Sequence, residues 1–432
     1  GLILRRAVPA DADRLSAFNA EIHREPNSET PDHRIDAWTR ELLQGDHPTF
    51  KPGDFTIVED THTGAIVSSL NLISQRWTYA GIEFGVGRPE LVGTHPEYRN
   101  RGLVRAQFEV MHQWSAERGE IVQGITGIPY YYRQFGYEMG LALGGGRSGY
   151  EPNVPKLKEG EAEPYRLRPA SEADLPFIMQ TYAEAMQRSL VACVRDEALW
   201  RYELFERNPD SVGRRELRVI ESTDGRAVGL SAHPPFLWRS ALAVTFYELA
   251  PGFSWLAVTP SVARYLWASG LEYAQREGKK LEGFAFHLGA EHPVYLAVPD
   301  RLSRTWNPYA WYVRVPDLPG FLRHIAPALE RRLAGSIAVG YSGELKLSFY
   351  RTGLRLVLEN GRLAGAESWQ PRPGDDGVAA FPDLSFLQLL FGYRSLEELE
   401  YAFKDCWVDK PEARVLLNVL FPKQNSNVWP VE

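Results

Sequence analysis

The sequence predicts an α/β (α+β) fold made of two strand–helix units of one pattern, followed by an α+β unit. Two observations carry this prediction. The segments LRRAVPAD, residues 4–11, and LRPASEAD, residues 167–174, share five residues, and the charged, proline-containing stretch 151–164 precedes the second one. At 432 residues the chain is also too long for one core. We therefore expect domains over 1–150, 151–315 and 316–432.

In the first unit, strands and helices alternate. The clearest helix covers residues 101–118, where Leu103, Val104, Phe108, Met111 and Trp114 form one apolar stripe and Gly119 ends it. We expect polar turns over 24–30 and at Thr63-Gly64. The other expected elements are strands over 2–7, 55–59, 65–74, 90–95 and 121–126, and helices over 11–23 and 36–43.

The second unit is expected to contain a strand over 253–258 and a helix over 261–276. No basic, glycine-containing turn lies between them, so any phosphate site there would have decayed.

In the third unit a helix over 318–333 precedes strands over 336–349 and 353–358. Asn360-Gly361 predicts a tight hairpin turn, and Ser395 with Glu398 predicts a capping box. This unit carries no recognisable constellation of catalytic side chains.

Composition narrows the functional class. The chain is 44% hydrophobic with a net charge of −7, which disfavours a general nucleic-acid binder. Two cysteines, Cys193 and Cys406, make neither a disulfide framework nor a zinc motif, so we expect no metal and a reducing compartment. No apolar run is long enough to span a membrane, and no leader pattern opens the sequence. A cytoplasmic location with no membrane partner is expected.

The segment ELVGTHPEYRNRGLVRA, residues 90–106, predicts an anion site. A strand ends near His95 and a helix begins after Gly102, where unpaired backbone N–H groups and the positive end of the helix dipole meet. Arg99 and Arg101 add charge, and together these groups suit a pyrophosphate. The alternative is an ordinary strand–turn–helix with surface arginines.

A second segment, GITGIPYYYRQFGYEMG, residues 124–140, follows about 25 residues later. Together the two segments resemble the GNAT superfamily of N-acetyltransferases, with Arg99 and Gly102 at the pyrophosphate turn and Val104 in its last position. More specifically, the chain resembles the enhanced-intracellular-survival (Eis-like) family. That resemblance implies tandem GNAT folds with mixed central sheets, the second degenerate, and a C-terminal domain like sterol carrier protein.

The resemblance implies acetyl-CoA as co-substrate. Tyr132 matches the family tyrosine that protonates the departing thiolate, and the ordinary tyrosine pKa of about 10 suits an acid. The alternative is that Tyr130, Tyr131 and Tyr132 form a packing cluster. The implied cofactor-binding residues are Val92, Gly93, Thr94, Arg99, Asn100, Arg101, Gly102, Leu103, Val104, Arg105, Gly127 and Ile128.

Two candidates for the base stay open. The resemblance implies the terminal carboxylate of Glu432, whereas other GNATs place a base where Glu90 stands. Glu90 is expected on the same strand face as Val92, and its alternative is a solvated strand residue. His95, before a proline, is interpreted as structural.

The expected function is acetyl transfer to a primary amine of a cationic acceptor, such as an aminoglycoside. Carboxylates between residues 21 and 38, near Trp38, would attract such an acceptor or form a solvated acidic face. The alternatives are a protein lysine or another small amine, and a non-catalytic lipid or ligand binder using residues 384–391. The resemblance also implies a homo-oligomer, a hexamer. The carboxylates near Trp38 that could attract the acceptor are Glu21, Glu25, Glu29, Asp32 and Asp36.

Overall fold

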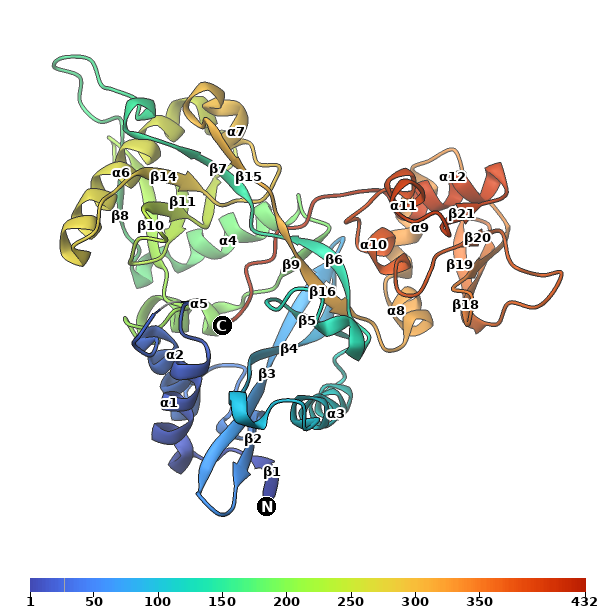
Figure 1. The fold of residues 1–432 in the computed structure, drawn as a ribbon. Helices are drawn as coiled ribbons and strands as arrows, with labels where there is room; N and C mark the ends of the chain where they lie inside the picture. Colours follow the sequence, from blue (N-terminus) through green and yellow to red (C-terminus); the bar gives the residue numbers. More distant parts are fainter. Residues whose placement is uncertain (27) are drawn as a thin grey trace.

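A computed structural model describes residues 1–26 and 28–432. Figure 1 shows three lobes, with the first 140 residues at the bottom, the second unit at upper left and the third at right. Within the described ranges, no helix is long and apolar enough to cross a membrane. The predicted turn over 24–30 includes residue 27, which lies outside them.

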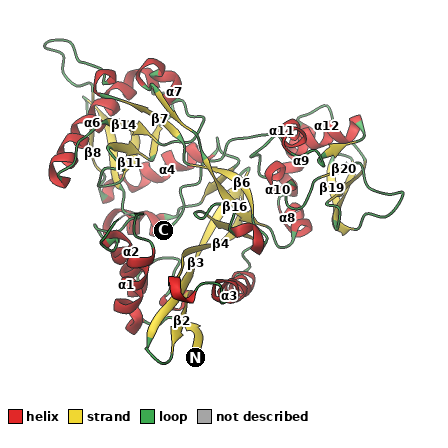
Figure 2. Cartoon of the chain, in the orientation of Figure 1, coloured by secondary structure: helices red, strands yellow, loops and turns green. Residues whose placement is uncertain are grey.

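The first unit is built on a mixed sheet in the order β1-β2-β3-β4-β5-β16-β6. Helices α1 and α2 cover one face and α3 covers the other, as Figure 2 shows. The predicted helix over 101–118 is confirmed as α3, with Phe108 and Met111 fully buried. The bounds are β1 (Leu2–Arg6), α1 (Ala12–Ile22), α2 (His33–Gln44), β2 (Phe55–Asp60), β3 (Ala65–Tyr79), β4 (Ile82–Thr94), α3 (Leu103–Glu117), β5 (Val122–Ile125) and β6 (Glu138–Leu143).

Strands β3 and β4 extend beyond the predicted segments and form one long hairpin. The strand predicted over 65–74 continues, since Gln75–Tyr79 pairs onward to the turn at Ala80-Gly81. Both turn residues have positive φ, 47° and 84°, which matches the twist of a two-residue hairpin turn. Because the first turn position holds an alanine, the composition of the sequence did not indicate this turn.

The second unit repeats the order of the first. Its sheet runs β13-β11-β10-β8, all antiparallel, as β4-β3-β2-β1 does. Arg5 holds Asp11 and Glu59 in the first unit, while Arg168 holds Asp174 and Glu221 in the second. The residues shared by the two sequence segments therefore include the same ion pair. The bounds are β8 (Tyr165–Pro169), α4 (Leu175–Met186), α5 (Glu197–Arg201), β10 (Glu216–Ser222), β11 (Ala227–His233) and β13 (Phe246–Leu249).

The strand predicted over 253–258 is wrong. The strand of this repeat is β13, which ends at Leu249, and helix α6 (Trp255–Glu277) already begins at Trp255. Apolar residues at the helix start were mistaken for a strand, because a short apolar run has no decisive period. Pro260 lies inside α6, in its second turn, where it removes one intrahelical hydrogen bond.

The first and second units exchange strands. Strand β7 (Gly146–Gly149) leaves the first unit and pairs with β14 (Gly283–Phe286) and β15 (Arg304–Trp306), whereas β16 (Tyr309–Arg314) inserts between β5 and β6. A short strand, β9 (Val191–Cys193), also pairs with β3. Each of these two units therefore contains a strand from the other side of position 150. The remaining elements of this half are β12 (Ala241–Val244) and α7 (Val294–Ala297).

The third unit packs helices against a five-stranded sheet ordered β19-β18-β17-β20-β21. The hairpin turn at Asn360-Gly361 and the Ser395 capping box are confirmed. The predicted helix over 318–333 is divided at Ile325, because Pro327 has no N–H to continue it. The strand predicted from 336 begins only at Gly343. The bounds are α8 (Leu318–His324), α9 (Ala326–Ala334), β17 (Gly343–Ser348), β18 (Gly353–Glu359), β19 (Arg362–Trp369), β20 (Ala379–Ala380), α10 (Phe386–Leu390), α11 (Leu396–Ala402), β21 (Trp407–Val408) and α12 (Pro411–Leu420).

Residues 422–432 return from the third unit and lie between the first two, where Figure 1 marks the C-terminus. Trp429 packs against Tyr182, Trp200 and Phe246. Arg195, fully buried, donates to the Pro430 carbonyl at 2.6 Å, and Val431 is buried beneath β3 and β4. This segment, called the tail below, joins all three units.

Candidate active site

The site lies where β4 and β5 separate. The two parallel strands pair only at Val86–Val122 and Gly87–Gln123 and then diverge. A cavity of about 920 Å³ occupies the gap between the end of β4 and the loop after β5. A ligand in this gap can contact backbone groups that no neighbouring strand uses.

A bulge in β4 shapes one wall of the cavity. Leu91 has a left-handed φ of 51°, and Leu91 with Val92 stands opposite the single residue Leu70. The expectation that Glu90 and Val92 share a face is therefore wrong. The bulge shifts the alternation, so Glu90 shares its face with Gly93, the face covered by α1.

The start of α3 forms the basic end of the cavity. Gly102 is the N-cap with φ 75°, and Asn100 has φ 63°, so the turn exposes successive backbone N–H groups. Arg99, Arg101 and Arg105 line the same end, and none has a carboxylate partner in the described part of the chain. Arg101 instead lies over Tyr98, 4.8 Å from the ring centroid. Unpaired positive charge at a helix start suits an anion.

The structure brings nearly all predicted site residues to this cavity. Glu90 and Tyr132 line it, and Glu432 does not. Every predicted cofactor residue lines it as well, namely Val92, Gly93, Thr94, Arg99, Asn100, Arg101, Gly102, Leu103, Val104, Arg105, Gly127 and Ile128.

Tyr132 begins a 3-10 turn after β5 and is 3% exposed. Its ring packs against Tyr312 and Phe108, with centroids 5.6 and 6.0 Å away, so the packing interpretation also applies to it. Its hydroxyl lies 3.7 Å from the position that a Cβ would take on Gly127, at the cavity wall. Burial, with a contribution from Glu90, raises the pKa of Tyr132 well above its usual range, so the phenol keeps its proton at neutral pH.

Glu90 faces the cavity from the other strand. Arg88 donates to its Oε1 at 2.6 Å. Burial raises the pKa of Glu90, Arg88 opposes that effect, and Glu432 adds to it. A carboxylate with a raised pKa next to a protonated phenol is an acid–base pair in one pocket.

Glu432 lies behind Glu90. Its backbone oxygen accepts from Arg207 at 2.6 Å and lies 3.1 Å from His47 Nε2, and its side chain is 3.8 Å from Arg88. Burial lowers the pKa of His47 to about 4, so its imidazole is neutral at pH 7. Arg88 also donates to the Val431 carbonyl at 2.7 Å. One buried guanidinium therefore connects Glu90 with the tail.

The other predicted candidates are accounted for by local structure. His95 accepts from the Glu97 N–H at 3.4 Å and shapes the turn before α3, which agrees with a structural role. Asp32 caps α2, Asp36 pairs with Arg40, and Trp38 is 5% exposed in the core. This favours the solvated acidic face over a binding surface.

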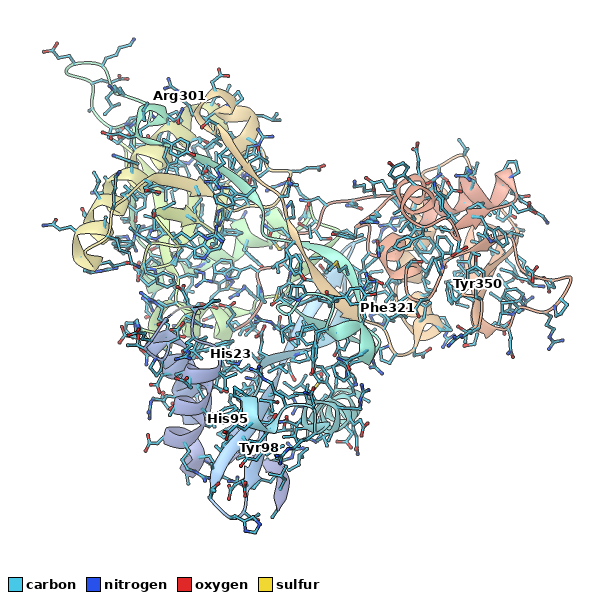
Figure 3. The ribbon with its side chains drawn as sticks, in the orientation of Figure 1. His23, His95, Tyr98, Arg301, Phe321 and Tyr350 are labelled. Atoms are coloured by element: carbon cyan, nitrogen blue, oxygen red, sulfur yellow. The ribbon has the colours of Figure 1, made fainter. Side chains whose placement is uncertain are left out.

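Helix α1 also contributes to the cavity, which no pattern in the sequence predicted. Ile22 and His23, at its end, line the cavity. They can do so because Gly93 has no side chain, and a Cβ there would lie 2.6 Å from Ile22 Cγ2 and 3.5 Å from His23 Nε2. His23 Nε2 is buried without a partner among the described residues, and burial lowers the pKa of His23. Figure 3 shows His23, His95 and Tyr98 between α1 and α3.

The described residues contain no group of three or more His, Cys, Asp or Glu side chains arranged to hold a metal ion. Cys193 and Cys406 are both free and buried.

Comparison with known proteins finds a family match in the first unit. Residues 5–140 match the family described as "Acetyltransferase (GNAT) domain". The whole fold resembles a GCN5-related N-acetyltransferase from Kribbella flavida, with a TM-score of 0.66 and 17% identity over 100% of this chain and 98% of that one. It also resembles Eis1 from Mycobacterium abscessus, with a TM-score of 0.61 and 15% identity over 99% of both chains. No curated protein matches the sequence. The chain thus carries a GNAT acetyltransferase domain within a fold shared along its whole length.

Proposed function

We propose that the protein transfers an acetyl group from acetyl-CoA to the primary amine of a small-molecule acceptor, as an Eis-like N-acetyltransferase. The observation that carries this proposal is one cavity with three parts. These are the basic α3 start, the bulged end of β4, and the pair Tyr132 and Glu90. The GNAT match over residues 5–140 supports the reaction class.

The cavity residues fit acetyl-CoA. The N–H groups after Gly102, with Arg99 and Arg101, would hold the pyrophosphate. The backbone from Val92 to Thr94, where β4 no longer pairs with β5, would hold the pantetheine arm and polarise the acetyl carbonyl. Gly127 and Ile128 would close the opposite side.

Two side chains would move protons. Glu90 accepts a proton from the attacking amine nitrogen, and Tyr132 donates its phenolic proton to the departing sulfur. The terminal carboxylate of Glu432 is the second candidate base. We favour Glu90 because it lines the cavity and Glu432 does not.

The acceptor would be a cationic amine drawn by the Glu90 carboxylate, such as an aminoglycoside or a polyamine, with a lysine side chain as the alternative. Thiol release from acetyl-CoA against these three amine classes tests the proposal. Release that depends on an acceptor establishes the activity and names the class. If acetyl-CoA neither binds nor turns over, the proposal fails.

The Eis-like resemblance adds two further proposals, a hexamer and a sterol-carrier-like third unit. Leu384, Phe386 and Leu387 line a cavity of about 1090 Å³ there, which would suit an apolar ligand. Sedimentation of the full chain tests the hexamer, since a monomer at all concentrations contradicts it. Lipid extraction of the purified protein tests the second, since an empty extract contradicts it.

The proton donor is tested by Tyr132→Phe. We expect kcat to fall by about 10²–10⁴, because general acid catalysis has that magnitude, while acetyl-CoA binding is kept. Tyr131→Phe is the matched control, since Tyr131 is the adjacent tyrosine on the same wall. Equal turnover in the wild type and Tyr132→Phe would remove Tyr132 from the mechanism.

A further inference from the structure

A second sheet, ordered β12-β14-β7-β15, has two unlike faces. Figure 1 shows its strands in the upper part of the molecule with α6 beside them. One face packs on α6 through Leu242, Val244, Phe284 and Phe286. On the other face, the register places Ala243, Ala285, Ser148 and Arg304 in one row across the four strands. The small side chains of Ala243, Ala285 and Ser148 thus form a floor, and Arg304 lies at its end.

A cavity of about 170 Å³ lies over this floor, and it shares no residue with the cavity of the GNAT domain. We call it the arginine–tryptophan slot. Trp238 and Arg239 form one wall from the turn before β12, while Arg304 and Trp306 form the other from edge strand β15. Its volume equals about five or six water molecules, the size of one small ring with one attached group.

Two positive charges converge in the slot. The Arg304 guanidinium lies 3.8 Å from the Trp306 ring centroid, and that of Arg239 lies 5.7 Å from the same centroid. Neither arginine forms an ion pair with a carboxylate in the parts of the chain that are described, although Glu282 also lines the slot. Trp306 Nε1 donates to Ser148 Oγ at 3.2 Å, which fixes the indole on the floor.

The tip of the slot is the two-residue turn Arg239-Ser240, which Trp238 and Ala241 close by two hydrogen bonds. Trp238 is 48% exposed, and Arg239 has a left-handed φ of 57°. A bulky residue in that region is a backbone outlier, and such outliers gather at binding sites. His287 packs edge-on against Trp238 at 4.7 Å, and burial with Arg239 lowers the pKa of His287 to about 4. At neutral pH it is therefore uncharged and offers both a donor and an acceptor.

We propose that the arginine–tryptophan slot binds a small planar organic anion, an aromatic ring carrying one carboxylate or phosphate group. The oxyanion would take the guanidinium groups of Arg239 and Arg304, whose planar forks match it. The ring would lie against the Trp238 and Trp306 indoles. This site is independent of the acetyl-transfer proposal.

Isothermal titration with matched probes tests the proposal on the full chain. Phenyl phosphate and benzoate carry both ring and charge, benzyl alcohol carries the ring alone, and inorganic phosphate the charge alone. We expect saturable binding of phenyl phosphate or benzoate and weaker binding of the other two. Whichever ring anion binds more tightly identifies the oxyanion.

The double variant Arg239→Gln/Arg304→Gln should lower the affinity for the tighter-binding ring anion by about 100-fold. Each charge-assisted contact is worth roughly tenfold in affinity. Both arginines are exposed, so the variant should fold, and acetyl-CoA turnover should stay as in the wild type. Arg226→Gln is the control, since Arg226 also lies over a ring, that of Phe253, outside the slot.

Three results would overturn the inference. These are no heat with any ring anion at millimolar concentration, equal affinity in wild type and double variant, or equal affinity for benzyl alcohol and phenyl phosphate. A wild-type dimer that the double variant dissociates, without anion binding, would also overturn it and make a second copy of this chain the occupant.

Discussion

At the scale of single residues, the proposed function depends on two side chains whose surroundings move their pKa values in one direction. Burial raises the pKa of both Tyr132 and Glu90, yet the consequences differ. A raised pKa keeps the phenol protonated at neutral pH, whereas it makes the carboxylate a stronger base once it is ionised. Arg88 limits the second effect by its hydrogen bond of 2.6 Å.

This environment predicts the acid limb of the pH–rate profile. As pH falls through the raised pKa of Glu90, the carboxylate gains a proton and can no longer accept one from the amine. Activity should therefore fall at a higher pH than an exposed glutamate, with a pKa of about 4.3, would give. Kinetics of kcat/KM against pH measure this limb.

Glu90→Gln should lower kcat/KM by about 10²–10⁴ and remove the limb. Glu83→Gln, on the same strand but half exposed, is the control and should behave as wild type. A limb that persists unchanged in Glu90→Gln would make the terminal carboxylate of Glu432 the better candidate.

At the scale of elements, two backbone features position the site, the bulge in β4 and the start of α3. Both depend on residues with positive φ, Leu91 in the bulge and Asn100 and Gly102 in the turn. Gly102 has no atom within 4 Å of a built Cβ, so space does not exclude a larger residue there. The left-handed φ of Gly102 instead disfavours other residues there by about 1 kcal/mol.

The α3 start should set the affinity for acetyl-CoA. Arg101→Gln is expected to raise the KM for acetyl-CoA roughly tenfold, because one charge-assisted phosphate contact is lost. The KM for the amine should not change. The difference between wild type and variant should shrink at high salt, since exposed charges are screened.

Arg362→Gln, an exposed arginine on β19 in the third unit, is the control. An unchanged KM for acetyl-CoA in Arg101→Gln at low salt would place the phosphates elsewhere.

The same elements explain what the sequence could predict. The α3 start was predictable because glycine, arginines and an amphipathic stripe occur together locally. The bulge at Leu91 was not, because no composition signal marks a leucine with positive φ. The contribution of Ile22 and His23 depends on a tertiary contact across Gly93, which the sequence does not show. The strand predicted over 253–258 was wrong because a short apolar run at a helix start has no decisive period.

At the scale of the whole molecule, the tail connects three units through buried polar groups. Arg195 and Arg207 are fully buried and share Glu203; Arg195 donates to the Pro430 carbonyl and Arg207 to a main-chain oxygen of the terminal Glu432. Loss of these acceptors would leave buried charges with fewer partners. The free-energy cost of such charges is larger than the net stabilisation that the hydrogen bonds provide. The strand exchange through β7 and β16 adds a second connection.

The tail should therefore stabilise the protein. Trp429→Ala is expected to lower the free energy of unfolding by about 3 kcal/mol, because it leaves a cavity against Tyr182, Trp200 and Phe246. Denaturant unfolding measures this change. Trp429→Phe should recover part of the loss by restoring an aromatic ring.

An unchanged unfolding midpoint in Trp429→Ala would contradict the connecting role of the tail. Activity gives a second measurement, because displacement of the tail frees Arg88 from Val431 and should lower kcat more than it raises the KM for acetyl-CoA.

The exchanged strands also bear on synthesis by the ribosome. The sheet of the first unit receives β16 from residues 309–314, and Arg88 connects Glu90 with residues 431 and 432. At about 5–20 residues per second, translation from residue 150 to 314 takes roughly 8–33 s. During that interval the nascent first unit has a sheet that lacks one strand, with exposed edges on β5 and β6. Such edges recruit other chains, so a nascent-chain chaperone would protect this protein longer than one whose active site closes early.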